Sequence, residues 1–246
     1  MQAHDRRPGP IHVAQAMITA GEMAEAISTV ANKLLSEQIV TSEGYNALLD
    51  EVRRLKRVPQ ATSWTVEIDR DNAIIFEPTL DERGQIITPR ISCKGISVEQ
   101  VQHDCPPFAA LDVALEIHDD SKNSLSRWHV DWANASNGEV QSGPLVHLQY
   151  GGHRPGHRET DHPLKVPRWS HPPMDILLLC ELVAANFYED RWVDLREDQS
   201  WCKAIGTAQR LCYSAYLRKM TEGLSISSKT LLQSMWASQW RVPVPA

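Results

Sequence analysis

Histidine and aspartate residues alternate with aromatic and aliphatic residues in two short segments of the chain. Residues 127–132 read Arg-Trp-His-Val-Asp-Trp, and residues 145–150 read Leu-Val-His-Leu-Gln-Tyr. Successive side chains of a strand point to opposite faces, so His129 and Asp131 share a polar face. If the two strands pair as a hairpin, His147 becomes their neighbour. Two imidazoles and a carboxylate this close suit acid–base catalysis or metal binding, so His129, Asp131 and His147 are candidate catalytic residues.

The same alternation is typical of an antiparallel sheet with one face in water. A preceding segment, residues 111–118, would add Glu116 and His118 to the polar face. Polar residues on such a face need no catalytic role, because antiparallel sheets commonly bury only one face. The sequence therefore favours the solvated face and keeps the catalytic site as the alternative.

Residues 151–172 form a segment rich in histidine, proline and basic residues, which we expect to be a loop. His153, His157 and His162 stand four and five residues apart, and Asp161 adds an oxygen ligand. These three histidines are candidate ligands of a divalent metal, although their spacing matches no fixed zinc pattern. No cofactor follows from the sequence beyond this metal.

The same segment also suits the capture of an anion. Its candidate ligand-binding residues are Arg154, Arg158, Lys165, Arg168 and Trp169. The four cations can bind phosphate, and the indole of Trp169 can stack on a base. A solvated loop held extended by its prolines is the remaining interpretation.

Several catalytic signatures are missing from the chain. It contains no G-x-x-x-x-G-K-[ST], no G-x-G-x-x-G, no G-x-S-x-G and no H-E-x-x-H. The net charge of −6 and the pI near 5.9 argue against a protein whose whole surface binds nucleic acid. A local basic patch stays compatible with this charge.

The cysteines and the apolar segments indicate where the protein works. The number of cysteines is odd, and none forms a C-x-x-C pair: Cys93, Cys105, Cys180, Cys202 and Cys212. Cys180, Cys202 and Cys212 lie in helical apolar patterns and are expected to be buried thiols. The longest apolar run, residues 176–180, is too short to span a bilayer. We therefore expect a cytoplasmic protein without membrane contact.

Hydrophobic periodicity predicts the order of elements. A helix is expected over residues 11–37, with Gly21 as a bend, and a second helix from a cap at Thr41 or Ser42 to Pro59. Strands are expected over residues 64–69, 73–77, 85–92, 111–118, 127–132 and 145–150, with an irregular stretch over 94–107. Helices follow over residues 174–187, after a cap at Asp198, and after a cap at Ser227 or Ser228.

This order predicts an α+β fold: an N-terminal helical hairpin, a central and largely antiparallel sheet of about six strands, and C-terminal helices. The hairpin covers residues 1–60 and the α+β body residues 61–246. Within the body, the sheet covers residues 61–150, the basic loop 151–172 and the helices 173–240.

The preferred functional interpretation is a non-enzymatic subunit or binding module of an intracellular, prokaryotic multi-protein assembly. We expect a protein partner or a homo-oligomer, with nucleic acid or another phosphate ligand bound through the loop 151–172. The alternative is a metal- or histidine-dependent hydrolase, a nuclease or phosphodiesterase, that uses His129, Asp131 and His147. A toxin-like or anti-phage defence factor is a weaker alternative.

Overall fold

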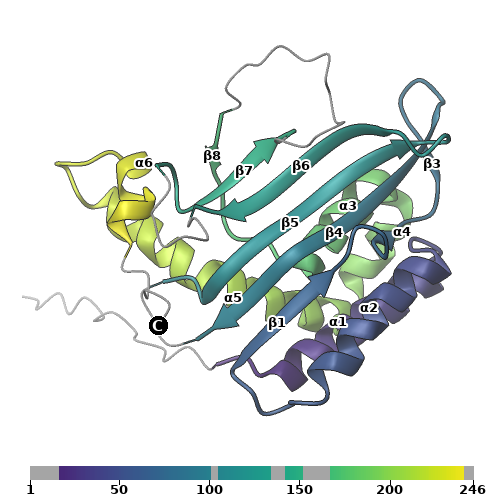
Figure 1. Ribbon diagram of the computed structural model, residues 1–246, viewed down its shortest axis with the longest axis horizontal. Coiled ribbons are helices and arrows are strands. Elements are labelled where there is room, and N and C mark those ends of the chain that lie inside the picture. Colours follow the sequence, from purple (N-terminus) through teal and green to yellow (C-terminus); the bar gives the residue numbers. More distant parts are fainter. Residues whose placement is uncertain (1–16, 101–104, 134–141, 152–166, 241–246) are drawn as a thin grey trace, which may run out of the picture.

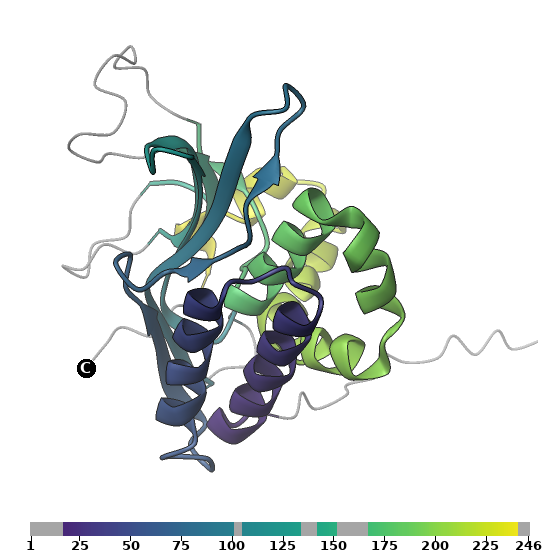
Figure 2. The ribbon, with the colours of Figure 1, turned by 90° about the vertical axis from the view of Figure 1, so that its right-hand side faces the viewer.

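A single antiparallel sheet and a layer of helices make up the protein. The computed structural model describes residues 17–100, 105–133, 142–151 and 167–240. The helices α1 to α5 lie behind the sheet in Figure 1 and on one side of it in Figure 2. Among the described residues, no helix covers the opposite face of the sheet. The predicted α+β architecture is therefore confirmed.

The N-terminal hairpin consists of α1 (Ala20–Ser36) and α2 (Ser42–Leu55). Thr19 caps α1 in a capping box with Glu22, and Thr41 caps α2 as predicted. The expected start of the first helix at residue 11 is wrong for residues 17–19, which precede the first helical residue, Ala20. Gly21 does not bend the helix but lies in its first turn, where a Cβ atom would lie 2.9 Å from the carbonyl oxygen of Pro59.

The strands form an eight-stranded sheet in the order β1-β4-β5-β6-β7-β8, in which β2 and β3 also pair with β4. Every pairing is antiparallel. The strands are β1 (Ser63–Ile68), β2 (Ile74–Ile75), β3 (Thr79–Leu80), β4 (Ile86–Glu99), β5 (Phe108–Asp119), β6 (Ser124–Trp132), β7 (Val146–Tyr150) and β8 (Trp169–Ser170).

Two strand assignments differ from the sequence prediction. The strand β4 runs to Glu99 through residues expected to be irregular, because a register shift between Cys93 and Gly95 interrupts the period-two pattern without ending the strand. The strand β8 lies inside the expected loop 151–172 and pairs with β7 over only two residues.

Four helices and a short 3₁₀ turn follow the sheet. They are α3 (Ile176–Phe187), α4 (Glu189–Glu197), α5 (Gln199–Leu224), α6 (Leu231–Ser234) and η1 (Ala237–Gln239). Asp198 caps α5 as predicted, but Thr230 rather than Ser227 or Ser228 caps α6. Over the described residues, none of the helices has the length and apolar character needed to cross a membrane.

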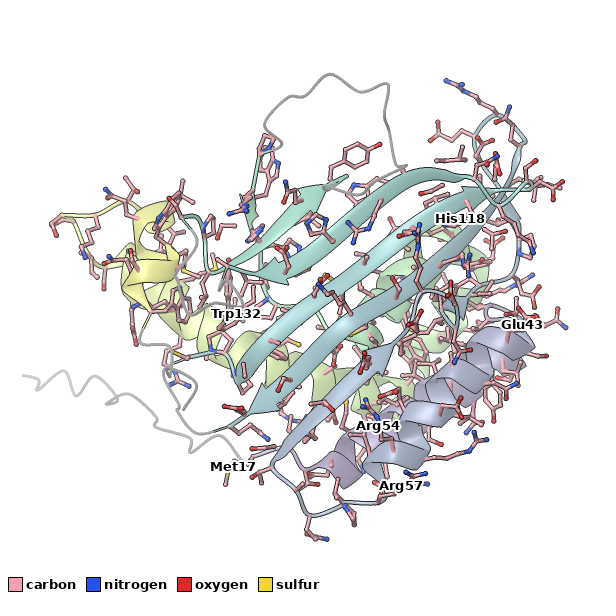
Figure 3. All side chains as sticks on the ribbon, viewed as in Figure 1. Met17, Glu43, Arg54, Arg57, His118 and Trp132 are labelled. Carbon is pink, nitrogen blue, oxygen red and sulfur yellow. The ribbon has the colours of Figure 1, made fainter. Side chains whose placement is uncertain are left out.

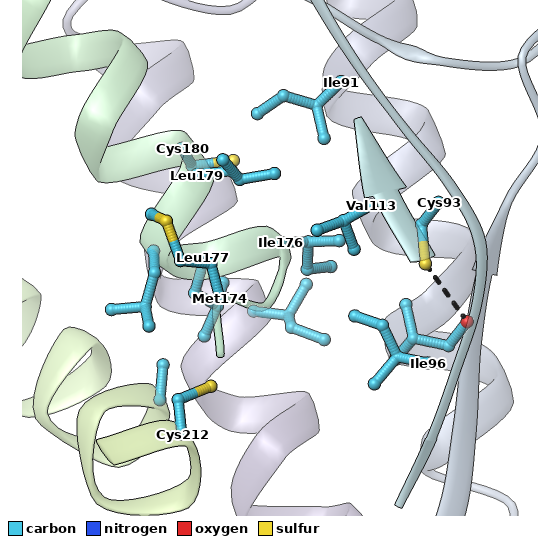
Figure 4. Packing of buried hydrophobic residues seen from close by; sticks show 14 of the residues in the cluster. Ile91, Cys93, Ile96, Val113, Met174, Ile176, Leu177, Leu179, Cys180 and Cys212 are labelled. Carbon is cyan, nitrogen blue, oxygen red and sulfur yellow. Dashed lines mark hydrogen bonds between the residues drawn. The ribbon is translucent and has the colours of Figure 1, made fainter. Parts of the chain in front are cut away.

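The apolar core lies between the sheet and the helices. Figure 4 shows Ile91, Ile96 and Val113 of the sheet facing Leu177 and Leu179 of α3. The buried residues of α1 and α2 belong to the same continuous cluster.

The cysteines are reduced, and most of them are small parts of the core. Cys93, Cys105, Cys180 and Cys212 are buried thiols. Cys202 was expected to be buried with them, but it is exposed.

Candidate functional site

The paired strands β6 and β7 bring the three candidate catalytic residues together. Asp131 lies directly opposite His147 in the ladder, and His129 lies opposite Gln149. The alternate residue Val130 is buried in the core on the helix side of the sheet. The period-two argument therefore places the polar residues on the open face, where Figure 3 labels His118.

Asp131 lies between the two imidazoles. Its Oδ1 atom is 2.6 Å from Nε2 of His147, and its Oδ2 atom is 3.4 Å from Nε2 of His129. Burial alone would raise the pKa of Asp131, but hydrogen bonding and charge attraction from the two histidines outweigh it and lower the pKa to about 2. Asp131 is therefore ionised throughout the physiological range.

The tautomer of His129 follows from its neighbours. Its Nδ1 atom lies 3.1 Å from a guanidinium nitrogen of Arg127, which can only donate a hydrogen bond. Nδ1 is therefore the acceptor, and the proton of the neutral ring resides on Nε2, which faces Asp131. Both ring nitrogens of His129 are thus engaged within the protein.

Arg127 connects this group to a second buried carboxylate. Its Nε atom is 3.3 Å from Oε1 of Glu116, while Oε2 of Glu116 contacts Arg70 at 2.9 Å and Nε2 of His118 at 3.0 Å. The carbonyl of Lys122 lies 3.1 Å from Nδ1 of His118. Each ring nitrogen of His118 therefore faces one acceptor, the carboxylate of Glu116 or the carbonyl of Lys122.

We call this set of side chains the polar network; its members are Arg70, Glu116, His118, Arg127, His129, Asp131 and His147. Alternation along the strands predicted Glu116 and His118 on the polar face. The same alternation places Arg127, two residues before His129, on the polar face. Its contact with Glu116 on the neighbouring strand could not be predicted from that alternation. Arg70 has no sequence signal, since it meets Glu116 only through the turn after β1.

The polar network is compact rather than open. The side chains of His129 and His147 are 8% and 1% exposed, and that of Asp131 is 30% exposed. Within the described part of the chain, neither pocket is lined by these three residues, and no group of three or more His, Cys, Asp or Glu side chains could hold a metal ion. Both ring nitrogens of His147 are buried without a hydrogen bond among the described residues. Nε2 of His147 and Oδ1 of Asp131 are 2.6 Å apart, so this contact is close in distance but does not have the geometry of a hydrogen bond.

The basic loop is only partly described. The candidate metal ligands His153, His157 and His162 lie outside the described residues, and so do Arg154, Arg158 and Lys165. Arg168 and Trp169 are described and lie at the edge of the sheet, where Trp169 pairs with Leu148.

These two residues form an exposed pair beside the open edge. The side chain of Trp169 is 68% exposed, and a guanidinium nitrogen of Arg168 donates to the carbonyl of Ser142 at 3.2 Å.

Comparisons of the chain with protein-family models, with curated proteins and with solved structures give no match, so the geometry alone must support a functional proposal.

Proposed function

We propose that this protein is a non-enzymatic binding module that serves as a subunit of a multi-protein assembly. The observation that carries the proposal is the burial of the histidines of the polar network. A general base must present a free atom within about 2.6–3.2 Å of the proton that it removes. Here the nitrogens of His129 are used by Arg127 and Asp131, and His147 is almost completely buried.

The edge of the sheet at β8 is the contact surface in this proposal. Trp169 exposes most of its indole there, and the guanidinium of the exposed Arg168 stands next to it in the chain. An aromatic face beside a cation suits single-stranded nucleic acid, because a base stacks on the ring while the cation meets the phosphate. The basic residues Arg154, Arg158 and Lys165 precede this pair in the sequence and add positive charge to the same segment.

The test is binding of a fluorescein-labelled single-stranded RNA, measured by fluorescence anisotropy. Loss of one stacking contact is worth about 1–3 kcal/mol, so Trp169→Ala should weaken binding about 5- to 100-fold. Arg168→Ala should weaken binding less and reduce its salt dependence. Arg83→Ala, in the exposed turn before β4, is the matched control for a lost surface cation. Equal affinity of Trp169→Ala and the wild type would contradict the proposal.

A metal- or histidine-dependent hydrolase is the second candidate. One observation favours it: the carboxylate of Asp131 lies 2.6 Å from Nε2 of His147, and neither ring nitrogen of His147 makes a hydrogen bond among the described residues, so a nitrogen is left for proton transfer. His147→Ala and His129→Ala would then abolish hydrolysis of bis(p-nitrophenyl) phosphate or of oligonucleotides, while Asp120→Ala, in an exposed turn, would not. Stoichiometric metal in the purified protein, or such a loss with an intact fold, would favour the hydrolase over the binding module.

A further inference from the structure

A pocket of about 290 Å³ lies on the face of the sheet opposite the polar network. Its sheet wall includes Trp128 and Leu148, which alternate with the network residues along β6 and β7. Its other wall comes from α3 and includes Leu179, which Figure 4 shows on the side of the helix that faces the strands. The pocket therefore opens where the helix layer leaves β6 and β7 uncovered.

The lining selects an apolar ligand with aromatic character. Half-buried Trp128, Leu148, Leu182 and Phe187 offer ring faces and methyl groups, and the remaining wall is almost entirely aliphatic. Pockets for drug-sized ligands span about 300–1,000 Å³, and an apolar cavity of about 150 Å³ accepts benzene. A pocket of about 290 Å³ therefore has room for one or two fused rings and not for a long acyl chain.

Two polar residues line the pocket, and both retain an acceptor. Nδ1 of His171 lies 2.7 Å from the carbonyl of Pro172, which can only accept, so the neutral ring carries its proton on Nδ1 and an acceptor lone pair on Nε2. The amide nitrogen of Asn186 donates to the carbonyl of Leu182 at 2.7 Å, which leaves Oδ1 as the acceptor. A ligand with a hydrogen-bond donor can therefore pair with one of these acceptors.

We propose that this pocket binds a small planar aromatic molecule with one N–H or O–H donor, of the indole or phenol class. The apolar walls supply the affinity, and the acceptors of His171 and Asn186 fix the orientation of the ring. The pocket and the proposed contact at β8 use different residues, because neither Arg168 nor Trp169 lines the pocket.

Titration calorimetry of the full chain with indole and with 1-methylindole tests the proposal. Methylation removes the donor and leaves the ring almost unchanged. For nine heavy atoms in a preformed pocket we expect a dissociation constant for indole on the order of 0.1–1 mM. The 1-methyl compound should bind about 5- to 20-fold more weakly, since it cannot donate a hydrogen bond to either acceptor. Absence of saturable indole binding at about 5 mM, or equal affinity for both compounds, would overturn the proposal.

Two sets of variants locate the site. Leu182→Trp narrows the pocket mouth and should abolish indole binding, while Leu224→Trp, at a position that is 72% exposed and does not line the pocket, should leave it unchanged. His171→Ala with Asn186→Ala should remove the preference for indole over 1-methylindole. Indole binding that survives Leu182→Trp in a protein with an unchanged circular dichroism spectrum would place the ligand elsewhere and refute the assignment. If Leu182→Trp does not fold, Leu148→Phe makes the same test from the sheet wall.

Discussion

Asp175 carries a carboxyl group that is buried at the start of α3. Replacing it with asparagine tests how much the buried charge destabilises the folded protein. Its Oδ1 atom accepts hydrogen bonds of 3.0 Å from the backbone N–H groups of Leu177 and Leu178, which caps the helix. Its Oδ2 atom is buried without a hydrogen-bond partner among the described residues. Burial outweighs these hydrogen bonds and raises the pKa of Asp175 to about 6.

The direction of the pH effect follows from the raised pKa. The ordinary value is 3.8, so between about pH 4 and pH 6 the folded protein holds a proton that the unfolded chain has released. The contribution of Asp175 to stability is therefore greatest below pH 4, falls as the pH rises to 6, and is constant above. A shift of about two pKa units corresponds to about 3 kcal/mol.

Asp175→Asn should remove this pH dependence. Asparagine caps a helix about as well as aspartate, so the bonds to Leu177 and Leu178 can persist. At pH 7.5 the variant avoids the charge penalty of about 3 kcal/mol but places an amide N–H₂ at the unpartnered position, which costs about 1–2 kcal/mol. We expect the variant to be about 1–2 kcal/mol more stable than the wild type at pH 7.5 and less stable at pH 4.

Urea unfolding of both proteins at pH 4, 5, 6 and 7.5 measures this difference. Asp198→Asn is the matched control, because Asp198 caps α5 but is partly exposed and paired with Lys33. The side chain of Lys33 lowers the pKa of Asp198 below its ordinary value of 3.8, so the control should lose stability at pH 7.5 and show almost the same loss down to pH 4. A stability difference between Asp175→Asn and the wild type that does not change with pH would refute the reasoning.

Three further pairs of substitutions test the packing by chemical denaturation. Glu116→Ala should cost about 3–5 kcal/mol because it removes the buried carboxylate that Arg70, His118 and Arg127 contact, whereas Glu82→Ala, in an exposed turn, should change stability by about 0.5 kcal/mol or less. Gly44→Ala should destabilise by about 1–3 kcal/mol, since its Cβ would lie 2.4 Å from the carbonyl oxygen of Ile75, while Gly206→Ala in the open middle of α5 should stabilise by about 0.5–1 kcal/mol. Leu179→Ala should cost about 2–5 kcal/mol and Phe187→Ala less, because Leu179 is buried and Phe187 only partly so; equal effects would contradict the burial difference.

Alternation along the strands predicted which residues would meet, but not how deeply they would lie. The pairing of Asp131 with His147 follows from two period-two segments and one turn. The burial of both histidines does not, because it depends on the side chains packed around them, including Arg127. The contact between Arg70 and Glu116 joins residues 46 positions apart and requires the fold itself.

The elements that the sequence did not predict share weak periodic signals. The helix α4 buries only Leu195, so no apolar stripe marks it. The second half of β4 was not predicted, because the register shift near Gly95 interrupts the period-two pattern. The pocket could not be predicted, because it arises from the position of α3 over the sheet, and its apolar lining residues look like ordinary core residues in the sequence.

The strand β6 lies between the pocket and the polar network and separates them. Its even-numbered residue Trp128 lines the pocket, and its odd-numbered residues His129 and Asp131 belong to the polar network on the opposite face. Backbone pairing with β5 and β7 on both sides holds this alternation in place, since a slip of one residue would put the carboxylate into the apolar pocket. His129→Ala should therefore leave indole binding unchanged, and Leu182→Trp should leave RNA binding unchanged. An indole affinity that changed with His129→Ala would contradict this separation. It would show that the pocket and the polar network are coupled through β6.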